Sequence, residues 1–405
     1  MHAALPRVLV VTSRLDIGGT ERHLTRVLPV LRRRGIDIVL YVMERGGPLE
    51  AELVANGVRV EGPRRARFLH WTKATLALAG FLRRERPTIV HFFLPRPYVY
   101  GSIAAELAGQ RRRLMSRRSL TDYRAKYPLL RSLERLLHSR TLGVIGNSKA
   151  VVEQLAAEVG DRRKLALIHN GIEMPARHTA SDRERMRQGL QIASEALVIA
   201  VVANLVAYKG HDDLLNALAV VKSDLAAPWR LIVIGRDDGI GAELKKKAQA
   251  CGISGNILWL GERHDVGELL AASDIFVLPS HQEGFSNALL EAMAAGVAAI
   301  ATAVGGNIDA VADHETGLLV QPCDPKALAA AIARLAEDAV LRRRFADAAR
   351  SRVQQQFSLD ACVDRYEKLY RALNEPAPAP IGEILRDEHG DAYSGAPPAA
   401  IEHAN

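Results

Sequence analysis

Two series of short apolar runs, separated by amphipathic helical patterns, constrain the fold of this chain more than any other feature. Buried runs that alternate with helices are typical of parallel sheets covered on both faces. We therefore predict an α/β protein with two Rossmann-like sheets. The first sheet is predicted from residues 7–11, 36–42, 58–60, 89–93, 113–116 and 142–146, and the second from residues 197–203, 230–235, 257–260, 275–278, 298–301 and 317–320.

The chain has 405 residues, which suits two domains of ordinary size. Residues 170–195 contain glycine, proline and a charged stretch, and we predict that they connect the domains. The first domain is expected over residues 1–178 and the second over residues 190–356. The segment 374–405 is rich in proline and alanine and is predicted to be disordered.

Charge is divided unevenly between the two halves. Residues 1–178 contain 32 Lys and Arg against 15 Asp and Glu, a formal charge of +17, whereas the remainder holds 22 against 31, a charge of −9. A basic half attracts anionic surfaces such as phospholipid, nucleic acid or a pyrophosphate-linked acceptor. Because the basic clusters at 32–34, 64–67 and 111–118 lack interleaved aromatic residues, we favour an anionic membrane surface over nucleic acid. The alternative is a solvated cationic face.

The cysteine content and the hydropathy pattern favour a cytoplasmic protein. Three cysteines occur without a Cys-x-x-Cys spacing, which predicts neither a disulfide framework nor a zinc site of that kind. No apolar run approaches the roughly 18 residues of a membrane-spanning helix, so any membrane contact is expected to be peripheral.

The most informative stretch follows the apolar run 275–278 and reads Ser-His-Gln-Glu-Gly-Phe-Ser-Asn-Ala-Leu-Leu-Glu from residue 280. Gly284 lets the backbone approach a ligand, and a helix predicted from about residue 286 to 295 directs its free N–H groups at the same place. Glu283 lies in the loop and Glu291 about one and a half turns into the helix, so they can contact different parts of one elongated ligand. The pattern indicates a sugar diphosphate site; the alternative is two ordinary surface carboxylates.

Two further segments can oppose the charge of a diphosphate. Lys209 is expected between a strand and a helix, where it can stabilise a departing nucleoside diphosphate. Gly18 and Gly19 follow the first apolar run and open a helix whose N-terminus can cap a phosphate. The absence of Gly-x-Gly-x-x-Gly argues against a nicotinamide or flavin domain. A Lys-Gly or Gly-Gly pair by itself is also common in ordinary turns.

Together these segments resemble glycosyltransferase family 4, the retaining GT-B enzymes that include many lipopolysaccharide, capsule and exopolysaccharide sugar transferases. Glu283 and Glu291 form its Glu-x7-Glu motif, and the resemblance extends from Gly18 to about residue 373. It implies a final helix, residues 357–373, that crosses back onto the first domain. It also implies a donor site made of Gly18, Gly19, Asn204, Lys209, Glu283, Gly284, Phe285, Ser286, Asn287, Ala288 and Glu291.

Within that resemblance, Glu283 would contact the donor sugar and Glu291 the ribose, while Lys209 and Gly19 would flank the diphosphate. Asn204 departs from the pattern, because many relatives carry an arginine there; Arg236 or a basic group of the first domain is the expected replacement. Some relatives have a catalytic histidine at the position of Phe93, so His91 is either a catalytic substitute or a buried strand histidine.

The acceptor side is predicted from the basic stretch that begins at residue 111. We expect Arg117 or Arg118 to meet an acceptor phosphate, with a surface or salt-bridge role as the alternative.

The reaction implied by the resemblance moves a sugar, with retention, from a nucleotide-diphosphate donor to a glycan or lipid-linked acceptor in cell-surface polysaccharide biosynthesis. The leaving phosphate oxygen would help to deprotonate the acceptor hydroxyl, with Lys209 and Glu283 beside the reacting centre. No Asp-x-Asp occurs at a suitable strand end, so neither a metal nor another cofactor is expected. The alternatives are a nucleotide-sugar 2-epimerase and a catalytically weak nucleotide-sugar-binding subunit of a larger assembly.

Overall fold

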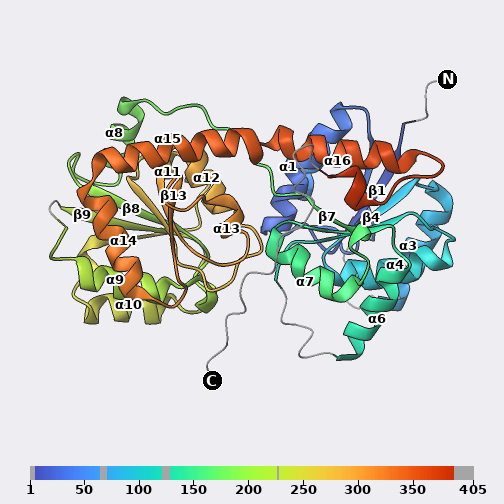
Figure 1. Ribbon diagram of the computed structural model, residues 1–405, viewed down its shortest axis with the longest axis horizontal. Coiled ribbons are helices and arrows are strands. Elements are labelled where there is room, and N and C mark those ends of the chain that lie inside the picture. Colours follow the sequence, from blue (N-terminus) through green and yellow to red (C-terminus); the bar gives the residue numbers. More distant parts are fainter. Residues whose placement is uncertain (1–4, 64–70, 121–127, 226–227, 387–405) are drawn as a thin grey trace.

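The chain forms two parallel sheets that lie in separate lobes, side by side along the longest axis (Figure 1). The computed structural model describes residues 5–63, 71–120, 128–225 and 228–386. The strand order is β3-β2-β1-β4-β5-β6-β7 in the first sheet and β10-β9-β8-β11-β12-β13 in the second. All described pairings within these sheets are parallel. The prediction of two Rossmann-like sheets is therefore confirmed.

The strands lie close to the predicted ranges, with one addition. β7 was not predicted, because three residues directly after a basic stretch give too short a pattern to identify. The first sheet contains β1 (Arg7–Thr12), β2 (Asp37–Val42), β3 (Arg59–Glu61), β4 (Ile89–Phe93), β5 (Arg113–Arg117), β6 (Gly143–Gly146) and β7 (Leu165–Leu167). The second contains β8 (Leu197–Val202), β9 (Trp229–Ile234), β10 (Ile257–Gly261), β11 (Ile275–Leu278), β12 (Ala298–Thr302) and β13 (Gly317–Val320).

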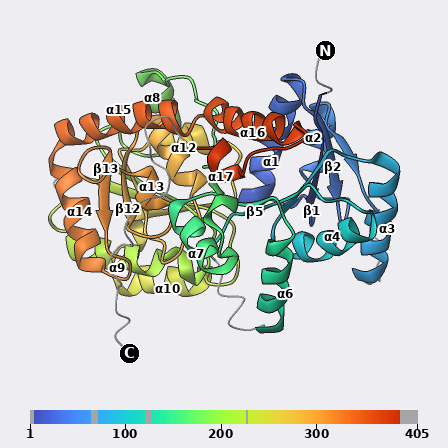
Figure 2. The same ribbon diagram turned by 45° about the vertical axis from the view of Figure 1, so that its right-hand side comes forward.

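Helices cover both faces of each sheet (Figures 1 and 2). The first lobe contains α1 (Gly19–Arg33), α2 (Glu50–Ala55), α3 (Trp71–Glu85), α4 (Pro95–Leu107), α6 (Pro128–Ser139) and α7 (Lys149–Val159). The second contains α8 (Ala180–Gly189), the short 3-10 helix η2 (Ala207–Lys209), α9 (His211–Val221), α10 (Gly241–Ala250), α11 (Val266–Ala271), α12 (Asn287–Ala295), α13 (Asn307–Ala310), α14 (Pro325–Glu337) and α15 (Ala339–Gln356). The chain continues through α16 (Leu359–Asn374) and α17 (Ile381–Ile384).

Burial on both faces explains why the strands read as continuous apolar runs. In β1, Val8 and Val10 pack into the core that includes Leu24 and Tyr366, whereas Leu9 and Val11 face the opposite core. All four β1 side chains are at most 1% exposed. Successive strand residues point to opposite faces, so a strand covered on both sides has no polar alternation.

The second domain begins earlier than residue 190, where it was predicted to start. α8 is capped by a reciprocal pair of hydrogen bonds between Thr179 and Asp182. Arg183 and Arg187 of this helix both form ion pairs with Asp274, which directly precedes β11. The charged composition of this segment suggested a linker, but two of its charges dock the helix onto the second lobe.

The predicted crossing of the C-terminal helix is confirmed. Figure 1 shows α15 on the second lobe leading directly into α16 on the first, where α16 lies beside α1. Ser358 caps α16 by accepting a hydrogen bond from the backbone of Ala361. Arg34, just after α1, pairs with Asp360, Asp364 and Glu367 of α16, so part of the basic cluster at 32–34 is neutralised within the molecule.

The prediction of disorder from residue 374 onward was wrong for residues 374–386, since Asn374 ends α16. Ile381 of α17 is fully buried and Leu385 is 6% exposed, and both belong to the first-lobe core. Ile381 fits directly over Gly143, where an added Cβ would lie only 2.2 Å from its Cδ1 atom. The surrounding prolines and alanines hid this apolar pair in the composition. Residues 387–405 lie outside the described part of the chain, as does the basic cluster at 64–67.

Within the described residues, we find no helix that combines the length and the apolar character needed to cross a bilayer.

Candidate active site

A cavity of about 440 Å³ opens between the carboxyl ends of strands from the two sheets. In open parallel sheets, this edge is where ligands bind. The cavity is lined by Gly19, Thr20, Arg118, Ser119, Leu120, Asn147, Asn170, Tyr208, Lys209, Gln282, Glu283, Gly284 and Phe285.

The second lobe contributes an ion pair to this cavity. Lys209 ends η2, shortly after β8, and its Nζ atom lies 2.7 Å from Oε1 of Glu283, which follows β11. The hydroxyl of Ser280 donates to the same carboxylate oxygen at 2.8 Å. Glu283 is only 9% exposed, so its carboxylate is held in one position. Two residues predicted to act on the donor therefore lie together.

The loop that carries Glu283 is closely packed against backbone on both sides. A Cβ atom added at Gly284 would lie 2.3 Å from the carbonyl oxygen of Arg118 in the first lobe. A Cβ atom at Gly305, whose φ is +49°, would lie 1.7 Å from the carbonyl oxygen of Glu283. Only glycine fits at these two contacts. They fix the Glu283 loop relative to both lobes.

The first lobe contributes the N-terminus of α1, as the Gly-Gly pair predicted. Gly18 is the N-cap residue and its φ is −137°, so this position uses ordinary extended backbone. A Cβ atom added at Gly19 would meet nothing within 4 Å, which leaves open space in front of the helix. The first turn of this 15-residue helix therefore borders the cavity, and the carboxylate of Glu21, whose pKa burial raises, already accepts one of its backbone N–H groups.

Arg118 is the second first-lobe contribution, and it lies beside the predicted donor residues. Its Nη2 atom donates to Oδ1 of Asn170 at 2.6 Å, and burial lowers the pKa of its guanidinium. Asn170 in turn donates to Oδ1 of Asn287 at 2.6 Å and to the carbonyl of Phe285 at 3.2 Å. Arg118 is thereby positioned by a hydrogen-bonded link between the lobes.

Arg117 does not lie on an acceptor surface, and its predicted acceptor role is wrong. Its side chain is fully buried, and Nη1 lies 2.7 and 2.6 Å from the two carboxylate oxygens of Glu158 on α7. Nη2 lies 3.6 Å from the buried carboxylate of Glu134 on α6. Arg117 ends a strand, where consecutive residues turn to opposite faces, so it points into the helical layer while Arg118 lines the cavity.

His91 is a buried strand histidine, and the structure does not support its catalytic assignment. Its ring is fully buried, with Nδ1 2.7 Å from the hydroxyl of Tyr370 and Nε2 2.9 Å from the hydroxyl of Ser116. Burial and the nearby Arg118 guanidinium lower the pKa of His91 to about 3. It is not among the residues that line the cavity. His91 instead joins β4 and β5 to the crossing helix α16.

Asn204 lies beside the cavity rather than in its lining. Its amide nitrogen donates to Asp238 at 3.0 Å, and its oxygen accepts from the backbone N–H of Arg236 at 3.3 Å. The Arg236 guanidinium is held by Asp238, with 2.6 Å between Nε and Oδ1. Two replacements for the missing arginine charge were considered, Arg236 and a basic group of the first domain. Only the second reaches the cavity, and it is Arg118.

The predicted helix after Glu283 forms as α12, but its residues lie behind the cavity wall. Ser286 caps the helix by accepting from the backbone of Leu289, and Asn287 bonds to Asn170. Neither these two residues nor Ala288 and Glu291 line the cavity.

Glu291 pairs with an arginine that the sequence analysis missed. Its Oε1 atom lies 2.8 Å from Nη2 of Arg26, which comes from α1 in the other lobe. Gly19, Arg22 and Arg26 follow a spacing of three and four residues, which places them on one face of the helix. This spacing in the sequence could have predicted that Arg26 lies on the same face of α1 as Gly19.

The comparison with protein families divides the chain into the same two lobes. Residues 17–174 match the family described as Glycosyltransferase Family 4, and residues 182–352 match the family described as Glycosyl transferases group 1. The chain is 26% identical over 296 residues to the N-acetyl-alpha-D-glucosaminyl L-malate synthase of Bacillus anthracis, covering 72% of this chain and 77% of that protein. It is also 26% identical over 362 residues to the lipopolysaccharide core biosynthesis glycosyltransferase LpsE of Rhizobium meliloti, covering 87% and 95%.

Solved structures share the fold. The crystal structure of the Anabaena protein HepE in complex with UDP superimposes with a TM-score of 0.80 at 21% sequence identity. The match covers 89% of this chain and 98% of that one.

Proposed function

Because this chain belongs to glycosyltransferase family 4, we propose that it transfers a sugar from a nucleoside diphosphate donor to an acceptor hydroxyl, with retention of configuration. The observation that carries the proposal is the convergence of Lys209, Arg118 and the N-terminus of α1 on one cavity. Three positive groups from two lobes match a diphosphate better than a neutral sugar or a singly charged ligand. The related structure of Anabaena HepE contains UDP, and UDP is such a diphosphate.

The leaving group is stabilised by these positive groups. As the sugar–phosphate bond breaks, negative charge builds up on the diphosphate, and fixed donors that face it lower the barrier. Lys209 exchanges its contact with Glu283 for a phosphate oxygen, and Arg118 meets the diphosphate from the opposite lobe. The freed Glu283 carboxylate, still held by Ser280, accepts a hydrogen bond from a donor sugar hydroxyl.

The acceptor hydroxyl attacks from the same face that the diphosphate leaves, and a leaving phosphate oxygen receives its proton. This route needs no nucleophilic carboxylate, so the chain's task is to hold both substrates in contact. We propose that the side chains of Arg118 and Lys209, together with the N-terminus of α1, supply the positive charge that other enzymes obtain from a metal ion. Turnover in the presence of a strong chelator tests this part directly.

We propose a glycan or lipid-linked acceptor and a peripheral position on an anionic membrane. The relatives include proteins named for lipopolysaccharide and capsule biosynthesis, which are not named as epimerases. Arg32 and Arg33 remain exposed on α1, although Arg34 and Arg113 are paired within the protein. Sedimentation with vesicles that contain or lack an anionic phospholipid tests the membrane proposal.

The test of the proposed reaction is a panel of UDP-, GDP-, ADP- and CMP-sugars, with binding followed by thermal shift and turnover by nucleotide release. We expect one diphosphate donor to be selected. Lys209→Ala and Arg118→Ala should each lower kcat by about 10²–10³, the usual effect of losing one preorganised group that stabilises transition-state charge. Arg236→Ala is the matched control, because its charge is held by Asp238 outside the cavity lining.

Donor binding without release in the presence of acceptor extracts would favour a non-catalytic subunit, and inversion of the anomeric signal in the product NMR spectrum would refute retention. Equal turnover in wild type, Lys209→Ala and Arg118→Ala would remove the charge argument.

A further inference from the structure

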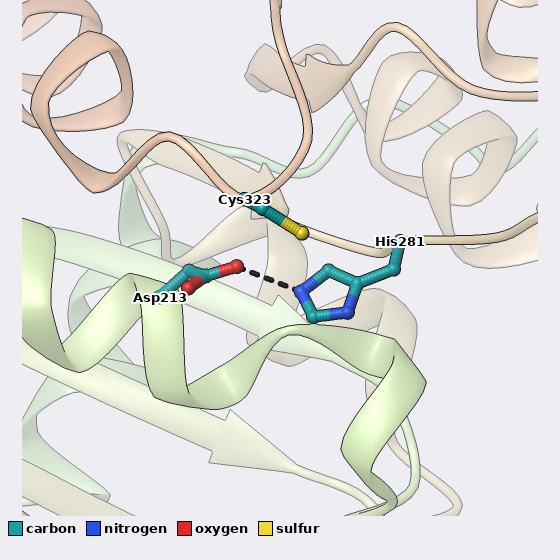
Figure 3. Close-up of side chains that lie close together, drawn as sticks. All are labelled: Asp213, His281 and Cys323. Carbon is teal, nitrogen blue, oxygen red and sulfur yellow. Dashed lines mark hydrogen bonds and ion pairs between the residues drawn. The ribbon is translucent and has the colours of Figure 1, made fainter. Parts of the chain in front are cut away.

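Outside the cavity, three side chains with different ligand atoms converge on one point of the second lobe. Figure 3 shows the sulfur of Cys323 directed toward the hydrogen-bonded pair of Asp213 and His281. His281 Nε2 and Asp213 Oδ2 lie 2.7 Å apart, and the three potential ligand atoms all lie within 4.8 Å of one another. No other group of this kind occurs among the described residues.

The three residues come from three separate segments at the carboxyl edge of the second sheet. Asp213 lies in the first turn of α9, His281 follows β11, and Cys323 lies between β13 and α14. The backbone N–H of His281 also donates to the carbonyl of Tyr208 at 2.7 Å, which ties this histidine to the segment before Lys209. A convergence of residues so distant in the chain is set by the fold rather than by local sequence.

The ligand types are those of a borderline metal ion. A thiolate, an imidazole and a carboxylate suit Zn²⁺ or Co²⁺, whereas Mg²⁺ and Ca²⁺ require mainly oxygen ligands. We propose that Asp213, His281 and Cys323 form a three-ligand site for a divalent metal of the zinc type, with water as the fourth ligand. This site is separate from the cavity and from the transfer reaction, for which we propose no metal.

Metal binding replaces the hydrogen bond between His281 and Asp213: Nε2 and Oδ2, now 2.7 Å apart, move to the spacing of metal ligands, and the proton between them is released. Tetrahedral zinc places its ligand atoms roughly 3.6 Å apart, given bonds of about 2.0–2.3 Å. Cys323 is exposed, so rotation of its side chain can bring the sulfur closer to the other two atoms. The side chains of His281 and Asp213 are 34% and 17% exposed, which leaves room for a water ligand.

The backbone and the electrostatics of Cys323 agree with the site. Its φ is +58°, a left-handed conformation that is uncommon for a residue other than glycine. Partial desolvation of the exposed Cys323 thiol, followed by the neighbouring Asp213 carboxylate, raises the pKa of this thiol, so a bound metal must displace its proton. Two anionic ligands that face each other gain from a cation placed between them.

The test is a Co²⁺ titration of the full-length protein after it has been stripped of metal with a chelator and desalted. We expect saturation near one equivalent, with a sulfur-to-cobalt absorption band in the near ultraviolet and tetrahedral bands in the visible region. Zn²⁺ should displace the cobalt and remove both. Cys323→Ser should lose the sulfur band, and Asp213→Asn or His281→Ala should weaken binding. Cys251→Ser is the matched control, since Cys251 lies at the end of α10, and it should keep the full spectrum.

A thermal-shift experiment guards against misfolded variants. One equivalent of Zn²⁺ should raise the Tm of wild type and of Cys251→Ser, because an ion bound only by the folded state stabilises it, and should leave the Tm of Cys323→Ser unchanged. Absence of the sulfur band, its persistence in Cys323→Ser, or binding only at a large metal excess would overturn the proposal.

Discussion

Replacing Arg117 by alanine distinguishes the structural role of this buried arginine from the role of the neighbouring Arg118, which lines the cavity. The substitution leaves Glu158 and Glu134, whose side chains are 6% and 0% exposed, without their guanidinium partner. Removing one member of a buried ion pair costs about 3–5 kcal/mol, because the remaining charge stays buried after losing its strongest partner. For a lobe of this size, each kcal/mol corresponds to a Tm shift of about 2–4 °C. We therefore expect the Tm to fall by roughly 6–20 °C.

The assay is thermal unfolding followed by circular dichroism, paired with donor turnover measured well below the transition. Arg117→Ala should be strongly destabilised, whereas Arg118→Ala should change the Tm by only a few degrees and lose turnover. Arg117→Lys retains the charge without the two guanidinium nitrogens that reach Glu158 and Glu134, so it should lie between wild type and Arg117→Ala in stability. A stable Arg117→Ala protein that has lost acceptor affinity would refute the structural role and restore the acceptor assignment.

Three further predictions concern the lobes and their contact. The folded state lowers the pKa of His91 from 6.5 to about 3, so on acidification the unfolded chain takes up this proton before the folded chain does. The free energy of unfolding should therefore fall as the pH drops below about 6.5. This group alone should contribute a loss of about 1.4 kcal/mol per pH unit down to about pH 3. Urea unfolding at pH 7 and pH 5 should show a smaller pH dependence in His91→Gln than in wild type or in the exposed-site control His264→Gln; equal slopes would contradict the assignment. Ile381→Ala should cost about 2–5 kcal/mol, the usual loss for a fully buried isoleucine, and a change below 0.5 kcal/mol in chemical denaturation would show that α17 does not belong to the core. If Glu291 binds the donor ribose, Glu291→Ala should raise the donor KM by about tenfold, equivalent to about 1.4 kcal/mol, whereas Arg26→Ala should leave it within threefold of wild type; matching losses in both variants would assign the ion pair itself as the important feature.

The sequence was sufficient for the features that depend on local pattern. Strand runs such as 275–278 and 317–320 were predicted without error, because strands buried on both faces have no competing periodicity. Glycine-rich strand ends also located Gly19, Lys209 and Glu283 correctly at one cavity. The direction in which each side chain points was harder to predict from the sequence. Arg117 and Arg118 are identical in sequence terms, and only the register of β5 against β6 and the helices behind it decides which one is buried.

Contacts between distant segments were out of reach for the same reason. Nothing local to His91 shows that Tyr370 of α16 will cover it, and nothing local to Glu291 shows that Arg26 will pair with it. The packing of α17 could not be predicted for a different reason. Burial of Ile381 depends on the absence of a side chain at Gly143, more than 230 residues earlier in the chain. Composition describes the average of a segment, whereas docking depends on one or two side chains with a complementary site.

The two glutamates of the motif share a feature that bears on how the donor enters. Glu283 is paired with Lys209 and Glu291 with Arg26, so both carboxylates already have a cationic partner. A diphosphate that replaces the carboxylate beside Lys209 brings more negative charge to the same lysine, while sugar hydroxyls can satisfy the released carboxylate. After the exchange the lysine faces the diphosphate and the Glu283 carboxylate keeps hydrogen bonds from Ser280 and the sugar hydroxyls, which limits the cost of desolvating these groups. A neutral sugar alone offers Lys209 no such replacement. If the proposed function holds, this arrangement would favour a ligand that carries both a sugar and a diphosphate over either part alone.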